Sequence, residues 1–256
     1  MLADDLAYSL TPSIWAEDLK LVRDLKGNPS RLDPWQRLAL DSGAQRIVLC
    51  CSRQSGKSSV CALMALHTCI FQPGALVLLI SRSIRQSAEL FMKFVTFLER
   101  LPDPPARTED TKLSTILENG SRCVSLPSSE ATIRGFSAVS LLIEDEASRV
   151  SDDIFVTSAP MLSVSRGRQV LLSTPFGKAG HFYKIWTEEN NWLKIQIKAD
   201  QCPRLTPEIL EEQMALFGPI KFAQEHNCEF IEDEFIIFTD ERIERAINDD
   251  IEEIPI

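Results

Sequence analysis

Short runs of apolar residues that alternate with helix-like stretches constrain the fold of this chain more than any other feature of its sequence. Strands that are apolar along their whole length are buried on both faces, which is typical of a parallel sheet covered by helices. Strands separated by helices in this way predict an α/β fold with a mostly parallel central sheet. The expected strands are Arg46–Cys51, Ala75–Ser81, Ser140–Glu146 and Gln169–Thr174, and the expected helices are Lys57–Phe71, Ile84–Leu101 and one after Ser151.

The residues before the first strand predict a helical N-terminal segment. Thr11-Pro12 places a capping residue and a proline ahead of a helix expected over Ile14–Lys26, and Gly27-Asn28-Pro29 ends that helix. Asp33-Pro34 repeats the arrangement before a short helix expected to end near Gly43. We expect residues 1–45 to pack on the domain that holds the sheet.

Two further patterns complete the expected organisation. Asn119-Gly120 is a strong hairpin signal and predicts two short flanking strands. After residue 175 the pattern changes to a helix over 179–190, a strand over Trp192–Lys198 and helices within 206–227, which we expect to form a small lid-like subdomain. The expected division is therefore a helical segment over 1–45, a core over 46–175, a lid-like subdomain over 176–230 and an acidic tail over 231–256.

The segment from Cys51 to Ser58 follows an expected buried strand and begins an expected helix. It matches the phosphate-binding loop G-x-x-x-x-G-K-[ST] except at its first position, which Cys51 occupies. Gly56 allows the backbone to wrap around phosphates, which the N–H groups of a helix N-terminus attract. Lys57 would meet the β- and γ-phosphates, and the Ser58 hydroxyl would ligate Mg²⁺. A lysine at an ordinary helix start with a capping serine remains the alternative. The candidate nucleotide contacts are Ser52, Arg53, Gln54, Ser55, Gly56, Lys57 and Ser58.

A second motif, Leu141-Leu142-Ile143-Glu144-Asp145-Glu146, is an apolar strand that ends in acids. Carboxylates at the carboxyl end of a parallel strand face the crevice in which ligands bind. Asp145 would hold Mg²⁺, and Glu146 would orient or deprotonate the attacking water. An acidic loop after a strand is common, but its combination with the candidate phosphate loop favours a P-loop NTPase of the ASCE type.

Each remaining candidate residue has a functional and a structural interpretation. Ser173 and Thr174 end a buried strand, where they could sense the γ-phosphate or form an ordinary turn. Arg53 lies inside the loop and could reach the γ-phosphate or a neighbouring subunit. Arg134 lies in a loop before the acidic strand and is either an arginine finger or a solvated side chain. Gln36 could contact adenine or cap its own helix.

Net charge and cysteine content bear on partners and compartment. The net charge of −10 argues at first against a nucleic-acid partner, but residues 229–256 hold 11 acidic and two basic side chains, and therefore −9 of that total. Because DNA is a polyanion, we do not expect this acidic segment to line its path.

Seven cysteines without C-x-x-C spacing and three scattered histidines argue against a disulfide framework or a zinc site. The acidic N-terminus is unlike a signal peptide, and the longest apolar runs are too short for a bilayer, so we expect a soluble, intracellular protein.

Three motifs together resemble the motor domain of the large terminase subunit of tailed bacteriophages. They are the segments Ser52–Ser58, Leu142–Ala147 and Leu172–Pro175. The Arg-Gln-x-Gly-Lys-Ser form of the loop is the most specific of them, and the order and spacing of all three fit the family over residues 30–230. The resemblance implies ATP and Mg²⁺ as cofactors. It also implies that Lys57 and Ser58 hold phosphate and metal, that Asp145 binds the metal and that Glu146 activates water. Ser173 and Thr174 would couple hydrolysis to motion, and Gln36 would contact adenine. Arg53 would be the arginine of the loop, and Arg134 a finger that acts in trans.

The resemblance also implies partners. Members of this family package double-stranded DNA into a procapsid as a ring, usually taken as a pentamer, that docks on the portal protein and works with the small terminase subunit. We therefore expect an ATP-hydrolysing DNA translocase in the host cytoplasm, absent from the mature virion, monomeric in isolation and a ring when assembled. A nuclease domain follows the motor in the family, but too few residues follow residue 230, so we expect no DNA cleavage by this chain.

Two other functions stay open at this point. A helicase-like ATPase would need a second motor domain, for which this chain has no room. A nucleotide-dependent switch or assembly module would bind ATP tightly and hydrolyse it slowly. Glu146 distinguishes the switch from the motor, because a switch does not need a water-activating carboxylate after the metal-binding aspartate.

Overall fold

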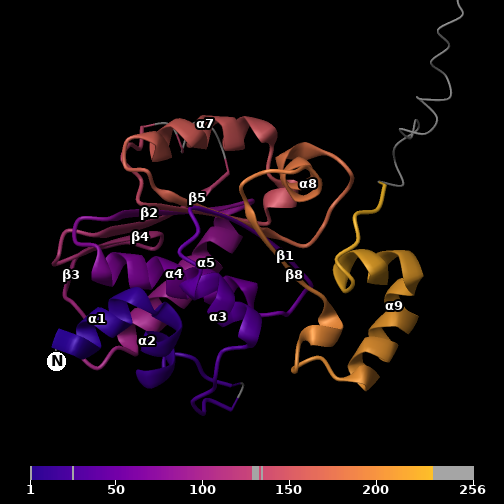
Figure 1. Cartoon of the computed structure of the whole chain (residues 1–256), viewed down its shortest axis with the longest axis horizontal. Helices are drawn as coiled ribbons and strands as arrows, with labels where there is room; N and C mark the ends of the chain where they lie inside the picture. Colours follow the sequence, from indigo (N-terminus) through magenta and orange to yellow (C-terminus); the bar gives the residue numbers. More distant parts are fainter. Residues whose placement is uncertain (1, 25, 129–132, 134, 233–256) are drawn as a thin grey trace, which may run out of the picture.

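A computed structural model describes residues 2–24, 26–128, 133 and 135–232 and contains one eight-stranded sheet flanked by helices (Figure 1). The helices are α1 (Leu2–Leu10), α2 (Pro12–Asp18), α3 (Pro34–Asp41), α4 (Lys57–Phe71), α5 (Ile84–Glu99), α7 (Asp152–Ser163), α8 (Gly180–Thr187) and α9 (Pro207–Glu225), with 3-10 turns η1 (Ala147–Arg149) and η2 (Ala199–Gln201). The strands are β1 (Arg46–Cys51), β2 (Leu76–Ser81), β3 (Arg107–Asp110), β4 (Ser114–Leu117), β5 (Arg122–Pro127), β6 (Leu141–Asp145), β7 (Arg168–Ser173) and β8 (Leu193–Ile197).

The sheet has the strand order β3-β4-β5-β2-β6-β7-β1-β8. The strands from β5 to β8 in this order are parallel to one another, whereas β3 and β4 pair antiparallel at one edge. The turn at Asn119-Gly120 joins β4 to β5, as the sequence predicts. The prediction of a mostly parallel α/β sheet is thus confirmed.

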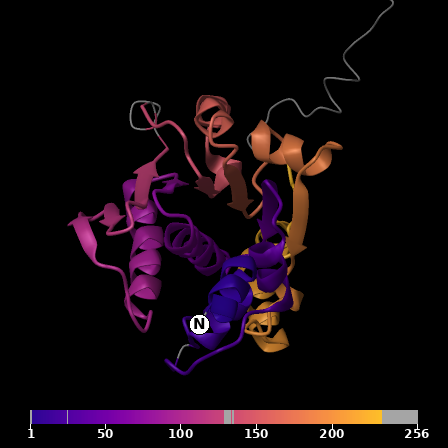
Figure 2. The ribbon, with the colours of Figure 1, turned by 60° about the vertical axis from the view of Figure 1, so that its left-hand side comes forward.

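Alternate residues of each buried strand face the two helical layers. In β1, Ile47 and Leu49 pack with α4 and α5, while Val48 and Cys50 pack toward Phe182 of α8. The N-terminal helices lie on the same side of the sheet as α4 and α5, and α7 and α8 cover the other side (Figures 1 and 2). Because both faces are covered, the central strands are apolar throughout.

The helix expected over Ile14–Lys26 was predicted wrongly, because α2 ends at Asp18. Lys20 adopts a φ of +53°, which turns the chain and places Leu21 fully in the core. The carboxylate of Asp24 then accepts the N–H groups of Lys26 and Asn28. Side-chain acceptors of this kind compete with the helical hydrogen bonds and favour a turn.

The lid-like segment expected over 176–230 is tied to the core by β8, which pairs with β1 in the main sheet. Helix α9 stands beside the sheet rather than on either of its faces (Figure 1). The expected division of the chain into domains stays a prediction, and most of the expected acidic tail lies outside the described residues, from residue 233 onward.

All seven cysteines are buried, free thiols. In the part of the chain that the structure describes, no helix is both long and apolar enough to cross a membrane.

Gly167, between α7 and β7, supports a first prediction on stability. A Cβ atom at this position would lie 2.0 Å from the carbonyl oxygen of Val139 and 2.8 Å from a methyl carbon of Leu162. Because backbone cannot give way as a flexible side chain does, we expect Gly167→Ala to lower the free energy of unfolding by about 2 kcal/mol or more. Urea unfolding would measure the loss. The control is Gly27→Ala, which meets no atom within 4 Å and carries only the strain of its φ of +83°; equal losses in both variants would contradict the steric explanation.

Candidate active site

The loop between β1 and α4 is a tight turn with two residues of positive φ. Gln54 and Gly56 have φ angles of +58° and +94°, and Ser52 and Ser55 are fully buried. The Ser55 hydroxyl donates to the Ser52 carbonyl oxygen at 2.9 Å, which closes the loop on itself. Gly56 is favoured here because of its left-handed backbone, and the side-chain nitrogen of Gln36 lies 2.7 Å from the place that a Cβ atom would take.

Cys51 stands where the phosphate-loop pattern has its first glycine. It is the last residue of β1, is fully buried and is not among the residues with positive φ. A side chain therefore fits at this position without backbone strain. Burial raises the pKa of its thiol, so the thiol stays neutral.

Asp145 and Glu146, the last two acidic residues of the second motif, lie at the same edge of the sheet as the loop. Asp145 ends β6, which is separated from β1 only by β7. Burial raises the pKa of Asp145, and the positive charge of Lys57 opposes that rise. Glu146 is half-buried and donates its N–H to the Asp145 carboxylate at 2.9 Å. Its φ of +56° is a strained conformation for a glutamate, of the kind found where a side chain must be aimed.

Ser173 and Thr174 contact the turn that follows Glu146. The hydroxyl of Ser148 lies 2.7 Å from that of Ser173 and donates to the Thr174 carbonyl oxygen at 2.8 Å. The sequence analysis missed Ser148, and no local pattern distinguishes it from an ordinary turn serine. These contacts join the ends of β6 and β7 into one unit.

Gln36 makes the capping contact that the sequence analysis left as one of two interpretations. Its Oε1 accepts the N–H of Asp33 at 2.9 Å, at the start of α3. Its side-chain nitrogen faces Gly56, at the wall of a cavity of about 630 Å³.

Arg204, which the sequence analysis missed, donates to the Asp33 carboxylate at 2.8 Å and to the Ser55 carbonyl oxygen at 2.7 Å. This arginine therefore joins the segment before α9 to the phosphate loop.

Of the two candidate arginines, the structure describes Arg53 but not Arg134. Arg53 extends toward α9, where its Nε lies 2.8 Å from the Glu225 carboxylate. Arg134 lies outside the described residues, so its role as a finger stays a prediction.

A network of His181 with two carboxylates, buried at His181 and Glu144, lies on the face of the sheet that α7 and α8 cover. The ring nitrogens of His181, at the start of α8, lie 2.8 Å from Glu144 and 3.1 Å from Asp152. Burial lowers the pKa of His181, but the two carboxylates outweigh it and raise that pKa overall. Glu144 is fully buried, and burial raises its pKa. The network fixes α8 against the strand that carries Asp145, and the sequence analysis did not find it.

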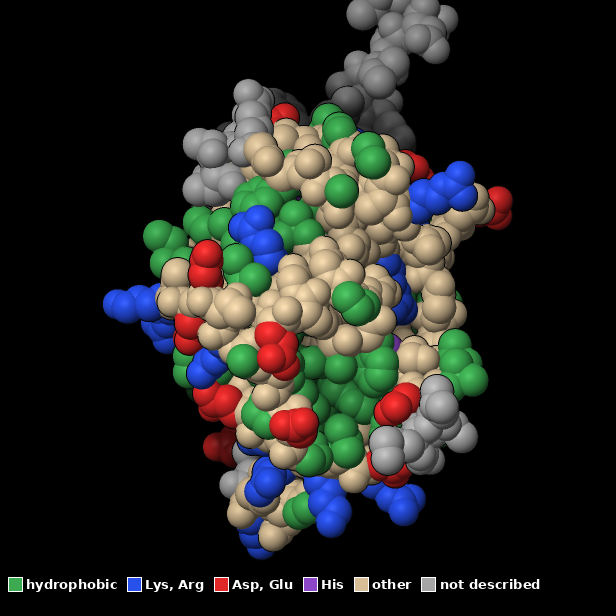
Figure 3. All heavy atoms as spheres, turned by 90° about the vertical axis from the view of Figure 1, so that its left-hand side faces the viewer, with side chains coloured by type: hydrophobic (Ala, Val, Ile, Leu, Met, Phe, Trp, Pro, Cys, Tyr) green, Lys and Arg blue, Asp and Glu red, His purple; other side chains and the backbone are tan. Residues whose placement is uncertain are grey.

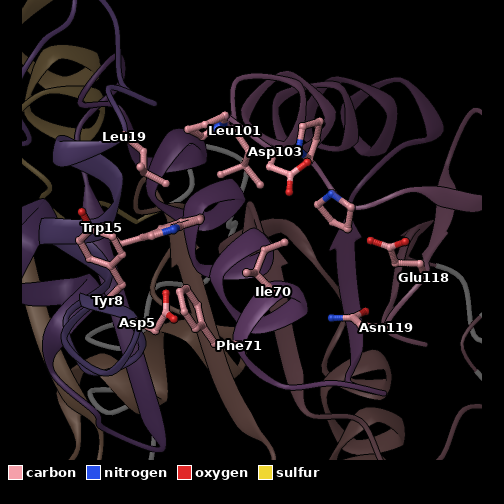
Figure 4. A pocket seen from close by; sticks show the side chains of 13 residues that line it. Asp5, Tyr8, Trp15, Leu19, Ile70, Phe71, Leu101, Asp103, Glu118 and Asn119 are labelled. Carbon is pink, nitrogen blue, oxygen red and sulfur yellow. The ribbon is translucent and has the colours of Figure 1, made fainter. Parts of the chain in front are cut away.

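Another pocket lies far from the phosphate loop, between the N-terminal helices and the segment 101–105 (Figure 4). Ile70 and Phe71, in the last turn of α4, line it, whereas the loop precedes the first turn of that helix. Figure 3 shows the side of the molecule that holds α1 and β3, where apolar side chains gather between acidic ones. This pocket is not part of the candidate active site.

The fold and the site define a class of protein. A strand that leads into the phosphate loop and a strand that ends in Asp145 are separated by one strand, β7, which ends at Ser173 just before Thr174. This arrangement is the core of a P-loop ATPase fold of the ASCE type. Residues 48–245 match the family described as terminase large subunit, T4likevirus-type, N-terminal. The chain belongs to this family, as the sequence analysis predicts.

Individual relatives agree with this assignment. The large terminase subunit of Thermus phage G20c is 28% identical over 164 residues, which are 57% of this chain and 34% of that protein. The solved ATPase domain of the large terminase of Thermus phage P74-26 superposes with a TM-score of 0.71 at 23% identity and covers 87% of this chain and 100% of that one. A large terminase of a thermophilic bacteriophage, solved with ADP, has a TM-score of 0.64 at 12% identity over 78% of this chain and 54% of that one. The chain spans about a third of the length of the curated relatives that it matches.

Proposed function

We propose that this chain is the ATP-hydrolysing motor domain of a large terminase subunit and translocates double-stranded viral DNA into a procapsid. The observation that carries the proposal is the meeting of the phosphate loop with Asp145 and Glu146 at one edge of the sheet. Membership of the terminase family supports it. So does the ADP complex of a solved relative with the same fold.

Four residues would carry the chemistry. The backbone N–H groups of the loop and the Lys57 ammonium would hold the phosphates, because phosphoryl transfer depends mainly on positioning and on neutralisation of charge. Glu146 would accept a proton from the attacking water. The Ser58 hydroxyl and the Asp145 carboxylate are oxygen donors of the kind that Mg²⁺ prefers. When bound there, Mg²⁺ would neutralise charge on the phosphate oxygens.

The donor set fits a metal that is shared with the nucleotide. Among the described residues, no three His, Cys, Asp or Glu side chains are grouped to hold a metal on their own. Mg²⁺ typically binds one or two carboxylates and takes its other ligands from water and substrate phosphates. Asp145, buried and next to the loop, suits that role.

The cavity beside Gln36 would hold the nucleoside part of ATP. It adjoins Gly56, so a nucleotide with its phosphates on the loop would extend into it. The side-chain N–H of Gln36 can donate a hydrogen bond to a ring nitrogen of adenine. Ser173 and Thr174 would transmit loss of the γ-phosphate through Ser148 to the turn that holds Glu146.

The partners of the motor are also part of the proposal. In the host cytoplasm, a homo-oligomeric ring of this subunit would engage DNA, the portal protein and the small terminase subunit. Family membership supports this assembly. A nuclease activity is not proposed for this chain.

Steady-state hydrolysis of ATP with Mg²⁺ tests the proposed active site. The assay compares the whole chain with its Lys57→Ala and Glu146→Gln variants. Hydrolysis that survives both substitutions would show that the active-site assignment is wrong.

Arg134 supports a separate prediction on assembly. If it completes the site of a neighbouring subunit, specific ATPase activity should rise with protein concentration, because the arginine acts only in an assembled ring. We expect Arg134→Ala to remove this rise and to lower the activity at high concentration by about a hundredfold or more, as loss of an arginine finger does. Activity per subunit, measured over a wide range of protein concentration, checks both statements. Flat activity together with an unaffected Arg134→Ala variant would rule out the trans finger.

A further inference from the structure

The pocket between the N-terminal helices and the segment 101–105, which we call the N-terminal pocket, combines aromatic side chains with exposed acids (Figure 4). Its volume of about 410 Å³ lies within the range of about 300 to 1,000 Å³ that is typical of ligand pockets. The aromatic side chains that line it belong to Tyr8, Trp15 and Phe71, and the acidic ones to Asp5, Asp103 and Glu118.

The walls of the N-terminal pocket are held in place by contacts within the chain. The rings of Trp15 and Phe71 meet edge to face with their centroids 5.8 Å apart, which joins α2 to the end of α4. Asn119 donates its side-chain N–H to the Cys69 carbonyl oxygen at 2.8 Å. The segment 102–105 contains three prolines, which restrict its backbone. A pocket whose walls are already ordered loses little conformational entropy when a ligand binds.

The charge around the N-terminal pocket has a single sign. None of the 13 residues that line it is basic. Asp5, Asp103 and Glu118 are exposed, and none of them takes part in the ion pairs that the described residues form. An apolar surface surrounded by unpaired carboxylates is complementary to an apolar group that carries positive charges beside it.

Charge and surface area select one kind of occupant. DNA is a polyanion, which these acids would repel. The chain's own residues 233–256 hold nine acidic and two basic side chains and would be repelled as well. A small cation would leave the neighbouring apolar surface of α1 uncovered, where Leu6 and Leu10, one turn apart, are 61% and 70% exposed. A basic stretch of polypeptide satisfies both the acids and this apolar surface.

We propose that the N-terminal pocket docks a basic segment of a partner protein. One large apolar side chain of that segment lies against the aromatic rings of the pocket, and the lysine or arginine side chains next to it pair with Asp103, Glu118 and Asp5. The inference goes beyond the proposed ATPase function and does not depend on it.

The position of the N-terminal pocket keeps the docked segment away from ATP. Phe71 ends α4 before β2 begins, and Asn119 precedes β5, which runs parallel to β2. The pocket therefore lies at the amino ends of these strands, whereas the phosphate loop follows the carboxyl end of β1. A partner can thus stay bound while nucleotide binds and leaves.

Binding of short labelled peptides to the whole chain provides the first test. The probe is the fluorescein-labelled pentapeptide Lys-Lys-Trp-Lys-Lys, and fluorescence anisotropy measures its affinity. We expect it to bind at least about tenfold more tightly than Lys-Lys-Ala-Lys-Lys, because only the tryptophan buries a large apolar side chain. We expect no binding of Glu-Glu-Trp-Glu-Glu. Equal affinity for the tryptophan and alanine peptides, or for the basic and acidic ones, overturns the proposal.

Removal of two acids of the pocket tests the location of binding. Because Asp103 and Glu118 are exposed, the double variant Asp103→Asn with Glu118→Gln should fold normally, and it should bind the tryptophan peptide about fivefold more weakly. The matched control, Asp153→Asn with Glu212→Gln, removes the same charge from α7 and α9 and should keep the wild-type affinity. Equal losses in the two double variants would show a general effect of net charge and would overturn the proposal.

Photo-cross-linking and sedimentation identify the contact and the occupant. With benzoylphenylalanine in place of its tryptophan, the peptide should cross-link to residues of α1, α4 or the segment 101–105, and cross-links confined to other elements overturn the proposal. Self-association of the wild type that the double variant of Asp103 and Glu118 abolishes would assign the pocket to a second copy of this chain, which also overturns it. A chain that binds the peptide at this pocket but hydrolyses no ATP would contradict the proposed function and support the docking site.

Discussion

Replacement of Lys57 by alanine is expected to reduce ATP hydrolysis by this chain at least about a hundredfold, as does loss of a preorganised charge-stabilising donor. Lys57 is the first residue of α4, at the end of the buried loop, and its charge acts on Asp145. Arg53, the other basic residue of the loop, lies with its Nε 2.8 Å from the Glu225 carboxylate. Phosphate release under saturating ATP and Mg²⁺ measures the loss.

The control for Lys57→Ala is Lys112→Ala, an exposed lysine in the turn between β3 and β4. It should retain the wild-type rate. Circular dichroism of both variants excludes unfolding as the cause. A Lys57→Ala protein that keeps more than about a tenth of the wild-type rate would contradict the role proposed for this lysine.

Replacement of Glu146 by glutamine is expected to lower the rate of hydrolysis by about a hundredfold to ten-thousandfold, the range of a lost general base. The amide keeps the size of the side chain but cannot accept the proton of the attacking water. Nucleotide affinity should stay within a few-fold of the wild-type value, because Glu146 does not belong to the phosphate loop. Single-turnover hydrolysis and equilibrium binding of ATPγS measure the two effects separately.

The result for Glu146→Gln also separates the proposed motor from a nucleotide-dependent switch. A switch that binds ATP tightly and turns over slowly would hydrolyse ATP at the same slow rate with and without this carboxylate. Glu109→Gln, an exposed glutamate at the distant edge of the sheet, is the matched control. A loss of hydrolysis confined to Glu146→Gln supports the motor, and unchanged rates in both variants support the switch.

The strands and helices of the core could be predicted because their causes are local. Helix α4 and strand β1 have the bounds that the sequence predicts, since a glycine turn and a continuous apolar run mark their ends. The prediction of a helix over Ile14–Lys26 was wrong because the free energy gained by burying Leu21 and by the hydrogen bonds of Asp24 overrides helix propensity. The membership of β8 in the main sheet could not be predicted either, because strand pairing is a contact between distant segments.

The candidate site likewise has parts that the sequence predicts and parts that only the tertiary structure reveals. The phosphate loop and the acidic strand end are short motifs whose chemistry depends on neighbouring residues in the chain. The residues that link these motifs to each other, such as Ser148, Arg204 and Glu225, have no local signature. The Arg204 contact with the loop joins residues 149 positions apart.

By itself, the sequence determined the class of fold and the residue types at the site, because apolar periodicity and loop chemistry act over a few residues. The resemblance to large terminases follows from the same short motifs. Only the tertiary structure decided which side chains meet, including the capping contact of Gln36, the Glu144–His181 network and the contact of Arg53 with α9. Those contacts depend on burial and charge pairing between segments far apart in the chain, and the packing of the whole sheet brings these segments together.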